Sequence, residues 1–179
     1  MIIGLQGYAG SGKSTVAQYL VERHGFARRH IKEPIADMTS VLIQAIYPDI
    51  DEKVYLFTDG EYKRTPIPEL GNRSATEIQQ FLGTEFGREF IDPDLWLNIW
   101  HRWAMAQPGH VVQESVRFAN EAERCDVVWE IRREGYGAHN GHVSEGLPCA
   151  EPVILWNNAS VEELHFTVDL ALSGMKMGA

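Results

Sequence analysis

The amino-acid sequence predicts a three-layer α/β fold, in which a parallel sheet of five strands lies between helices. Short apolar segments alternate with helical segments, a glycine-rich turn joins the first strand to the first helix, and 179 residues suit a single domain. The predicted strands are residues 1–6, 26–31, 110–113, 126–131 and 152–156. Strands that alternate with helices favour a parallel sheet, because each helix carries the chain back to the same edge.

Apolar residues at helical spacing, together with end signals, predict five helices, at residues 13–24, 34–46, 74–82, 92–107 and 160–172. Gly25 and Gly83 are expected to end the first and third of them. Trp96, Trp100 and Trp103 follow one another at spacings of four and three, which places all three indoles on one helix face, in the core. Residues 47–71 show no sustained period and are expected to be irregular.

Composition limits the classes of function. A net charge of −9 argues against broad attraction to a nucleic-acid polymer. No apolar run approaches the roughly 18 residues that a membrane span needs, and the amino terminus does not resemble a signal peptide, so we expect a cytoplasmic protein. Cys125 and Cys149 are expected to be reduced, structural thiols.

The most informative motif is a glycine-rich loop between the first strand and the first helix. It matches the P-loop pattern without a gap and predicts a P-loop NTPase fold. Glycines let successive N–H groups surround phosphate oxygens, and the following helix adds its positive end. Lys13 is expected to reach the β and γ phosphates and the Ser14 hydroxyl to bind Mg²⁺. The phosphates of ATP are expected to contact Gly7, Ala9, Gly10, Ser11, Gly12, Lys13, Ser14 and Thr15.

The loop alone does not fix the reaction, because GTPases, helicases and kinases share it. A GTPase would carry Asn-Lys-x-Asp after a late strand, where this chain has Asn157, Asn158, Ala159 and Ser160. Helicase-type ATPases need more chain and a more basic surface. A kinase of small molecules fits the size, and a glycine-rich turn without a ligand is the weaker alternative.

Three further runs carry a family resemblance. LGTEFGREFIDPDLW at residues 82–96, VRFANEAE at 116–123 and HVSE at 142–145 resemble the deoxynucleoside monophosphate kinases of bacteriophages, in the family's order. The resemblance implies transfer of the ATP γ-phosphoryl group to a deoxynucleoside monophosphate, with Mg²⁺, in the host cytoplasm. It also implies one nucleoside monophosphate kinase-like domain with an acceptor-binding region at about 47–108 and a lid at about 132–145. A homodimer is left open.

Such a reaction needs cations more than a strong base, because the acceptor phosphate is already an anionic nucleophile. Arg117 follows the third strand, and Arg132 and Arg133 follow the fourth, at the edge where ligands of open parallel sheets gather. Either Arg132 or Arg133 is expected to reach the transferring group. The predicted catalytic residues are thus Lys13, Arg117, Arg132 and Arg133.

The acceptor is assigned through the resemblance. Arg88 is expected at its phosphate, although a solvated arginine is the ordinary alternative, and Trp96 fits a base pocket or the core equally well. His142, Ser144 and Glu145 match the family or anchor the lid. The full acceptor set is Lys32, Arg73, Gln80, Thr84, Glu85, Arg88, Trp96 and Arg117.

Two positions depart from the family pattern. An aspartate of the family is Ser115 here, and an arginine is Thr76. Glu114 is a candidate metal ligand beside Ser14, but strand alternation would turn it to the opposite face from residue 115 unless the backbone shifts locally. Arg73 is a candidate to replace the missing arginine. These departures leave open a dephospho-coenzyme A kinase-like enzyme and a non-catalytic nucleotide-binding module. The base preference is not predicted.

Overall fold

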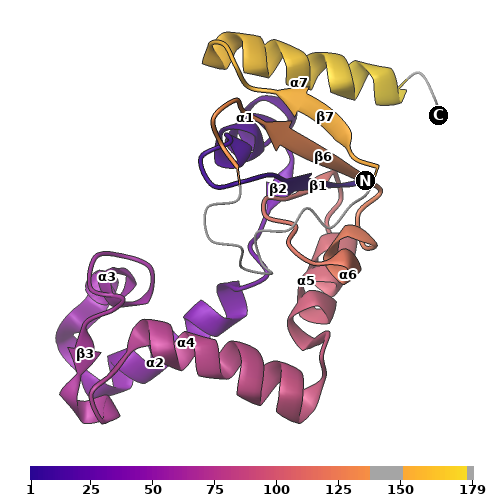
Figure 1. The fold of residues 1–179 in the computed structure, drawn as a ribbon. Coiled ribbons are helices and arrows are strands. Elements are labelled where there is room, and N and C mark those ends of the chain that lie inside the picture. Colours follow the sequence, from indigo (N-terminus) through magenta and orange to yellow (C-terminus); the bar gives the residue numbers. More distant parts are fainter. Residues whose placement is uncertain (138–150, 177–179) are drawn as a thin grey trace. The chain divides into compact units, whose positions relative to one another are not determined.

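The computed structural model describes residues 1–137 and 151–176 (Figure 1). The chain divides into two compact units, which are described separately. The sheet unit consists of Met1–His30 and His101–Ala179, and the helical unit is Ile31–Trp100. The helical unit overlaps the predicted acceptor region, residues 47–108, but begins earlier. Residues 138–145 of the predicted lid lie outside the described residues.

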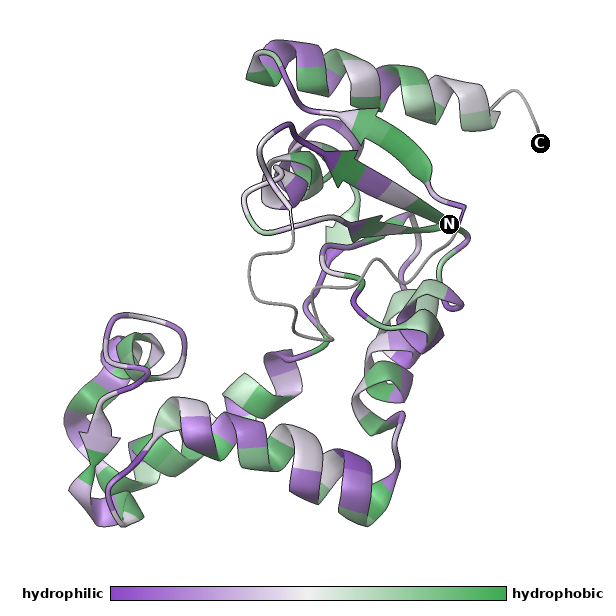
Figure 2. Ribbon diagram, in the orientation of Figure 1, coloured by the Kyte–Doolittle hydropathy of each residue, from purple (hydrophilic) through white to green (hydrophobic). Residues whose placement is uncertain are grey.

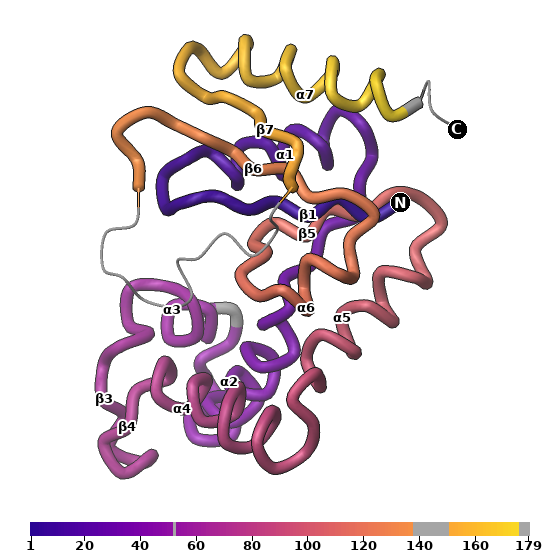
Figure 3. The backbone as a smooth tube through the Cα atoms, turned by 45° about the vertical axis from the view of Figure 1, so that its right-hand side comes forward, coloured from indigo at the N-terminus to yellow at the C-terminus, as the bar shows by residue number. Residues whose placement is uncertain are grey.

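The five-stranded parallel sheet is confirmed. Its order is β2-β5-β1-β6-β7, and every pair of neighbours is parallel. Figure 3 labels four of these strands, β5, β1, β6 and β7, in the sheet. The second strand is shorter than predicted, because the segment after it leaves the sheet. The strands are β1 (Ile2–Gln6), β2 (Ala27–Arg28), β5 (Val111–Gln113), β6 (Val127–Arg132) and β7 (Val153–Trp156).

Two helices share one buried core with the sheet. Helix α1 (Lys13–His24) has its predicted bounds, and α7 (Val161–Lys176) is the last helix. Alternate residues of β1 pack in a core with side chains of both helices, among them Ile3, Leu5, Leu20 and Val168. This core holds α1, and therefore the loop before it, against the carboxyl ends of β1 and β6.

The opposite side of β1 meets the segment that follows β5. A Cβ on Gly4 would lie 2.7 Å from both Cys125 Sγ and Val116 Cγ2. The short helix α6 (Ala119–Ala122) belongs to this segment. The chain beyond β5 is therefore packed tightly onto the sheet, which fixes the residues just after the strand.

The helical unit is more ordered than the sequence suggested. The prediction of an irregular stretch at residues 47–71 is wrong in part, because short helices and one antiparallel pair (Pro66↔Ser74) form around a core of Ile43, Ile67 and Ala75. Figure 2 shows hydrophobic and hydrophilic residues alternating along its helices. The elements are α2 (Glu33–Ile46), η1 (Pro48–Lys53), α3 (Val54–Thr58), β3 (Pro66–Ile67), η2 (Pro68–Leu70), β4 (Arg73–Ser74), α4 (Ala75–Phe81), η3 (Leu82–Ile91) and the part of α5 (Leu95–Met105) up to Trp100.

The third predicted helix begins as expected but does not end at Gly83. Ser74 and Glu77 form the predicted capping box, and the chain continues beyond α4 as the π-helix η3. The reason lies in Trp96, whose indole Nε1 donates to the Gly83 carbonyl at 2.9 Å while its ring packs against Gly87. A wider turn accommodates the ring, so Gly83 lies inside the helix.

The indoles of α5 differ in burial. Trp96 and Trp100 are buried, as predicted for a core face. Trp103 is only partly buried, and the guanidinium of Arg29 lies over its ring at 5.7 Å from the centroid. The prediction that all three indoles lie in the core is therefore confirmed for Trp96 and Trp100 and wrong for Trp103.

We predict that Gly87→Ala destabilises the protein, because the added methyl would overlap the buried Trp96 ring. Overpacking of this kind costs about 1–3 kcal/mol of unfolding free energy. Gly83→Ala is the matched control in the same helix, since its methyl would meet only Ile35 Cδ1 at 3.4 Å. Thermal unfolding of both variants measures the difference, and equal stabilities would contradict the packing described.

Candidate functional site

The P-loop connects β1 to α1 and depends on backbone angles that favour glycine. Gly7, Gly10 and Gly12 have φ values of 143°, 77° and 108°, all in the region that side chains rarely adopt. Space is limiting as well, because a Cβ on Gly7 would lie 2.5 Å from the Ile131 carbonyl oxygen. Backbone conformation and close packing therefore explain why glycine occupies each of these three positions of the predicted phosphate loop.

Lys13 closes the loop from its carboxyl side. Its Nζ donates hydrogen bonds to the carbonyls of Gly7 and Tyr8, each at 2.8 Å. Burial lowers the pKa of Lys13, the charge of Arg117 lowers it further, and Glu114 acts in the opposite direction. The ammonium group is therefore held near a second cation in a partly desolvated place, an arrangement that favours an anionic ligand.

A residue near the chain's end secures the loop. The amide of Asn157, just after β7, donates to the Ser11 carbonyl at 2.8 Å and packs against Gly12. The Ser11 hydroxyl is buried and has no hydrogen-bond partner among the described residues. In the sequence, Asn157 stands where a GTPase would have its guanine motif, and no local pattern points to its contact 146 residues away.

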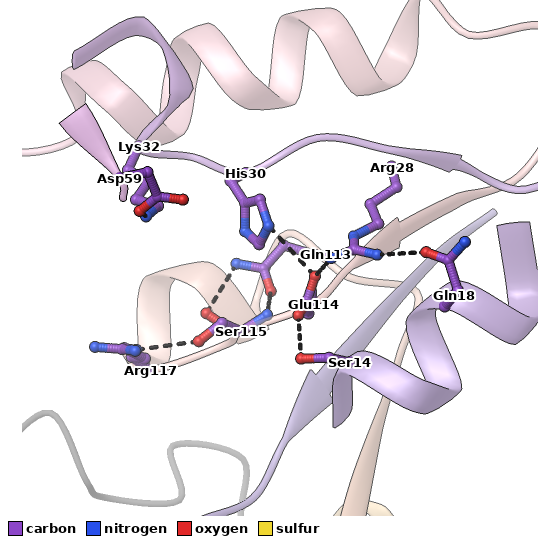
Figure 4. Close-up of polar contacts among 10 residues, drawn as sticks. All are labelled: Ser14, Gln18, Arg28, His30, Lys32, Asp59, Gln113, Glu114, Ser115 and Arg117. Carbon is purple, nitrogen blue, oxygen red and sulfur yellow. Dashed lines mark hydrogen bonds and ion pairs between the residues drawn. The ribbon is translucent and has the colours of Figure 1, made fainter. Parts of the chain in front are cut away.

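The two predicted metal ligands lie together (Figure 4). The Ser14 hydroxyl donates to Glu114 Oε1 at 2.5 Å, while Glu114 Oε2 pairs with Arg28 and lies 3.3 Å from His30 Nε2. Strand alternation did not apply here, because β5 ends at Gln113 and the backbone bends at Glu114. This bend supplies the local shift that Glu114 needed to face the P-loop.

Ser115 has a different part in the same segment. Its backbone N–H donates to Gln113 Oε1 at 2.9 Å, and its hydroxyl accepts from Arg117 Nε at 3.0 Å. The Arg117 backbone N–H donates in turn to the buried Glu121 carboxylate at 2.7 Å. Ser115 therefore orients Arg117, whose charge acts on Lys13.

The two arginines after β6 separate in space. The Arg132 guanidinium donates to the buried Glu130 carboxylate and lies over the Trp156 ring. Arg133 instead donates to the Gly10 carbonyl at 3.4 Å and stacks on Tyr136, 4.8 Å from the ring centroid. Tyr136 packs against Gly10 itself. Of the two, Arg133 is the one held at the P-loop.

Except for Arg117, all the predicted acceptor-binding residues belong to the helical unit. Lys32 pairs with Asp59 at 3.0 Å, and Arg73 pairs with Glu77 at 3.0 Å. Trp96 is buried with its N–H satisfied, as in a core. Four more are exposed on α4 and η3, namely Gln80, Thr84, Glu85 and Arg88. Their part in acceptor binding stays a prediction.

The hydroxyl of Thr76, where the family resemblance implies an arginine, donates to the Lys63 carbonyl at 2.8 Å. It therefore has a local role in joining α4 to the preceding turn. His142, Ser144 and Glu145 lie outside the described residues, as does Cys149.

The sheet unit thus gathers Lys13, Arg117 and Arg133 with a hydroxyl and a carboxylate at the carboxyl ends of parallel strands, where such folds bind ligands. In residues 1–137 and 151–176, no three His, Cys, Asp or Glu side chains cluster as a metal site. No helix in the described part of the chain combines the length and apolarity needed to cross a membrane.

A similar protein identifies the family. A protein of Acanthamoeba polyphaga mimivirus named "Putative deoxynucleotide monophosphate kinase" is 32% identical over 184 aligned residues, which cover 92% of each chain. The chain belongs to the deoxynucleotide monophosphate kinase family. This confirms the family resemblance predicted from the sequence, whereas a bacteriophage origin stays a prediction. No family model matches the sequence.

A solved structure supports the fold assignment of this family member. TT1252 from Thermus thermophilus superposes with a TM-score of 0.53 at 15% identity, covering 97% of each chain. At this identity the likeness shows the fold alone. The α/β prediction, with its parallel sheet flanked by helices, is confirmed.

We predict that Asn157→Ala loosens the P-loop, because it removes the side-chain donor to the Ser11 carbonyl. Hydrogen exchange of the peptide containing residues 7–14 should become faster than in the wild type. Asn158→Ala is the matched control, since Asn158 accepts from the Glu134 backbone N–H and not from the loop. Unchanged exchange in Asn157→Ala, or equal acceleration in both variants, would contradict this role.

Proposed function

We propose that the chain transfers the γ-phosphoryl group of ATP to a deoxynucleoside monophosphate and releases the diphosphate. The observation that carries the proposal is the position of Lys13, whose ammonium group lies 2.8 Å from two carbonyls of an intact P-loop, beside Ser14 and Glu114. The family of its mimivirus relative supports the choice of acceptor.

In this proposal the triphosphate enters the P-loop. The N–H groups of residues 7–15 and the start of α1 bind its oxygens, and Lys13 turns from the Gly7 and Tyr8 carbonyls to the β and γ phosphates. The buried Ser11 hydroxyl, which has no partner among the described residues, offers a further donor inside the loop. Desolvation of Lys13 strengthens its attraction to the phosphates.

Ser14 and Glu114 fit a magnesium ion. Both supply hard oxygen ligands, and their side-chain oxygens are 2.5 Å apart. Mg²⁺ is usually bound by one or two protein oxygens plus phosphates and water, which agrees with this small donor set. When bound, the ion would neutralise charge on the phosphates, and Ser14 with Glu114 would hold it beside Lys13.

The arginines would stabilise the transferring group. Arg117 is oriented by Ser115, and Arg133 is already at the Gly10 carbonyl. Charge that spreads over the phosphoryl oxygens in the transition state is stabilised by such fixed donors. Arg132 is committed to Glu130 and Trp156, so we assign the transfer role to Arg133 and a structural role to Arg132.

Our assignment of the residues that bind the acceptor monophosphate depends on the family resemblance. We propose that Arg88, with Lys32, Arg73, Gln80, Thr84 and Glu85, binds the monophosphate, and that residues 132–145 act as the lid of one kinase domain. Ion pairs of Lys32 and Arg73 with nearby carboxylates would exchange for the acceptor phosphate.

An assay of ADP release with each deoxynucleoside monophosphate tests the proposal. We expect turnover with at least one acceptor, and we expect Lys13→Ala to abolish it with the fold intact. No ADP above background with any acceptor, modified bases included, would refute transfer. Near-normal turnover in Lys13→Ala would contradict the assigned site.

We predict that Arg133→Met and Arg132→Met affect catalysis differently. Losing a donor that acts on transition-state charge lowers kcat by about 100-fold or more, and we expect this of Arg133→Met. Arg132→Met should mainly lower thermal stability, because the buried Glu130 would lose its ion-pair partner and keep only the hydrogen bond from the Gln6 amide. The measurement is kcat with melting temperature for both variants. The reverse pattern would exchange the two roles.

A further inference from the structure

Arg28 joins three elements around the site. It is the last residue of the edge strand β2, beside Val112 in the parallel register, so its side chain reaches the residues just beyond β5. One amino group donates to Gln18 Oε1 of α1 at 3.1 Å, and the other pairs with Glu114 Oε2 (Figure 4). Arg28 therefore connects α1 to the segment that follows β5.

The contact matters because Glu114 is nearly buried. Its side chain is 10% exposed, and an ionised carboxylate with so little water is costly unless it is paired. Arg28 and His30 lie at Oε2, whereas Ser14 occupies Oε1. Oε1 is therefore held toward the P-loop by the Ser14 hydrogen bond, whereas Oε2, which makes no hydrogen bond among the described residues, is held by the charge of Arg28 with His30 close by.

Both amino groups of Arg28 are engaged with Gln18 and Glu114. A planar guanidinium can hold two partners in fixed directions, which a lysine ammonium cannot do in the same way. These contacts favour an effect exerted through Glu114 over a direct contact of Arg28 with phosphate.

We propose that Arg28 is a positioning residue for the magnesium ion of MgATP: it holds the Glu114 carboxylate against Ser14, where the two side chains receive the ion. The inference rests on the proposed function only as far as MgATP binding, and it does not require phosphoryl transfer. His30 assists from the same side of the carboxylate.

Calorimetric binding of a non-hydrolysable ATP analogue, with Mg²⁺ and with chelator, tests the inference. The quantity compared is the gain in affinity that Mg²⁺ provides. Residues that orient a metal ligand typically contribute about 10- to 100-fold to metal affinity, so Arg28→Met should reduce the affinity gain from Mg²⁺ by about 10-fold or more. Affinity without metal should change by no more than about twofold, within the coupling expected of separate contacts. Arg29→Met is the matched control, because Arg29 stacks on Trp103.

A double variant separates positioning from general damage. If Arg28 acts through Glu114, Glu114→Gln should lower the same gain, and adding Arg28→Met to it should cause no further loss. If the double variant instead lost the product of the two single-variant losses in Mg²⁺-dependent affinity, the inference would be overturned. An Mg²⁺-dependent affinity gain in Arg28→Met equal to or larger than that of the wild type would also overturn it.

Arg28→Lys, compared with Arg29→Lys, gives the same test if Arg28→Met does not fold. We expect Mg²⁺ to increase the affinity for the ATP analogue less in Arg28→Lys than in Arg29→Lys. An equal increase in the two variants would overturn the inference. A chain that binds MgATP in the expected way but transfers nothing would refute the proposed function alone. A chain that does not bind MgATP would refute both.

Discussion

The close approach of the P-loop to its neighbours is the constraint on which the site depends. The loop turns where Gly7 lies against the Ile131 carbonyl and Gly12 against Asn157, so neither position has room for a side chain. Within this tight loop, Lys13 Nζ donates back to the Gly7 and Tyr8 carbonyls. The core shared by α1, α7 and the sheet holds the helix that carries Lys13 and Ser14.

The charged side chains around this loop fall into two groups, those paired with nearly buried carboxylates and those that we propose for ligand binding. Two nearly buried carboxylates at the ends of β5 and β6, Glu114 and Glu130, are each paired with an arginine. Arg28 and Arg132 offset their charges, and near the loop we propose Lys13, Arg117 and Arg133 as the cations that bind the anionic ligand. A site that gathers like charges can stay folded because the carboxylates are compensated locally.

The sequence predicted the features whose causes are local. Glycine spacing gave the loop, and apolar spacing gave the bounds of α1, Lys13–His24. The continuation of α4 into a π-helix was missed, because its cause is Trp96, thirteen residues beyond the Gly83 carbonyl that it contacts. The orientation of Glu114 depends on where β5 ends, and strand ends are set by packing that periodicity does not show.

The contacts of Asn157 and Arg28 were missed for the same reason. Each joins segments that are distant in the sequence or belong to different elements, and neither residue lies in a recognisable motif. The family resemblance could name an acceptor site, but it could not show that Trp96 is buried with its N–H satisfied. Local patterns therefore predicted the conformation of the P-loop better than the contacts of its supporting residues.

A crystal structure with a non-hydrolysable ATP analogue and Mg²⁺ tests the central claim most directly. We expect phosphates inside the P-loop, Lys13 Nζ moved from the Gly7 and Tyr8 carbonyls to phosphate oxygens, and the metal ion between Ser14 and Glu114. Phosphates bound outside the loop, with Lys13 still on both carbonyls, would contradict it.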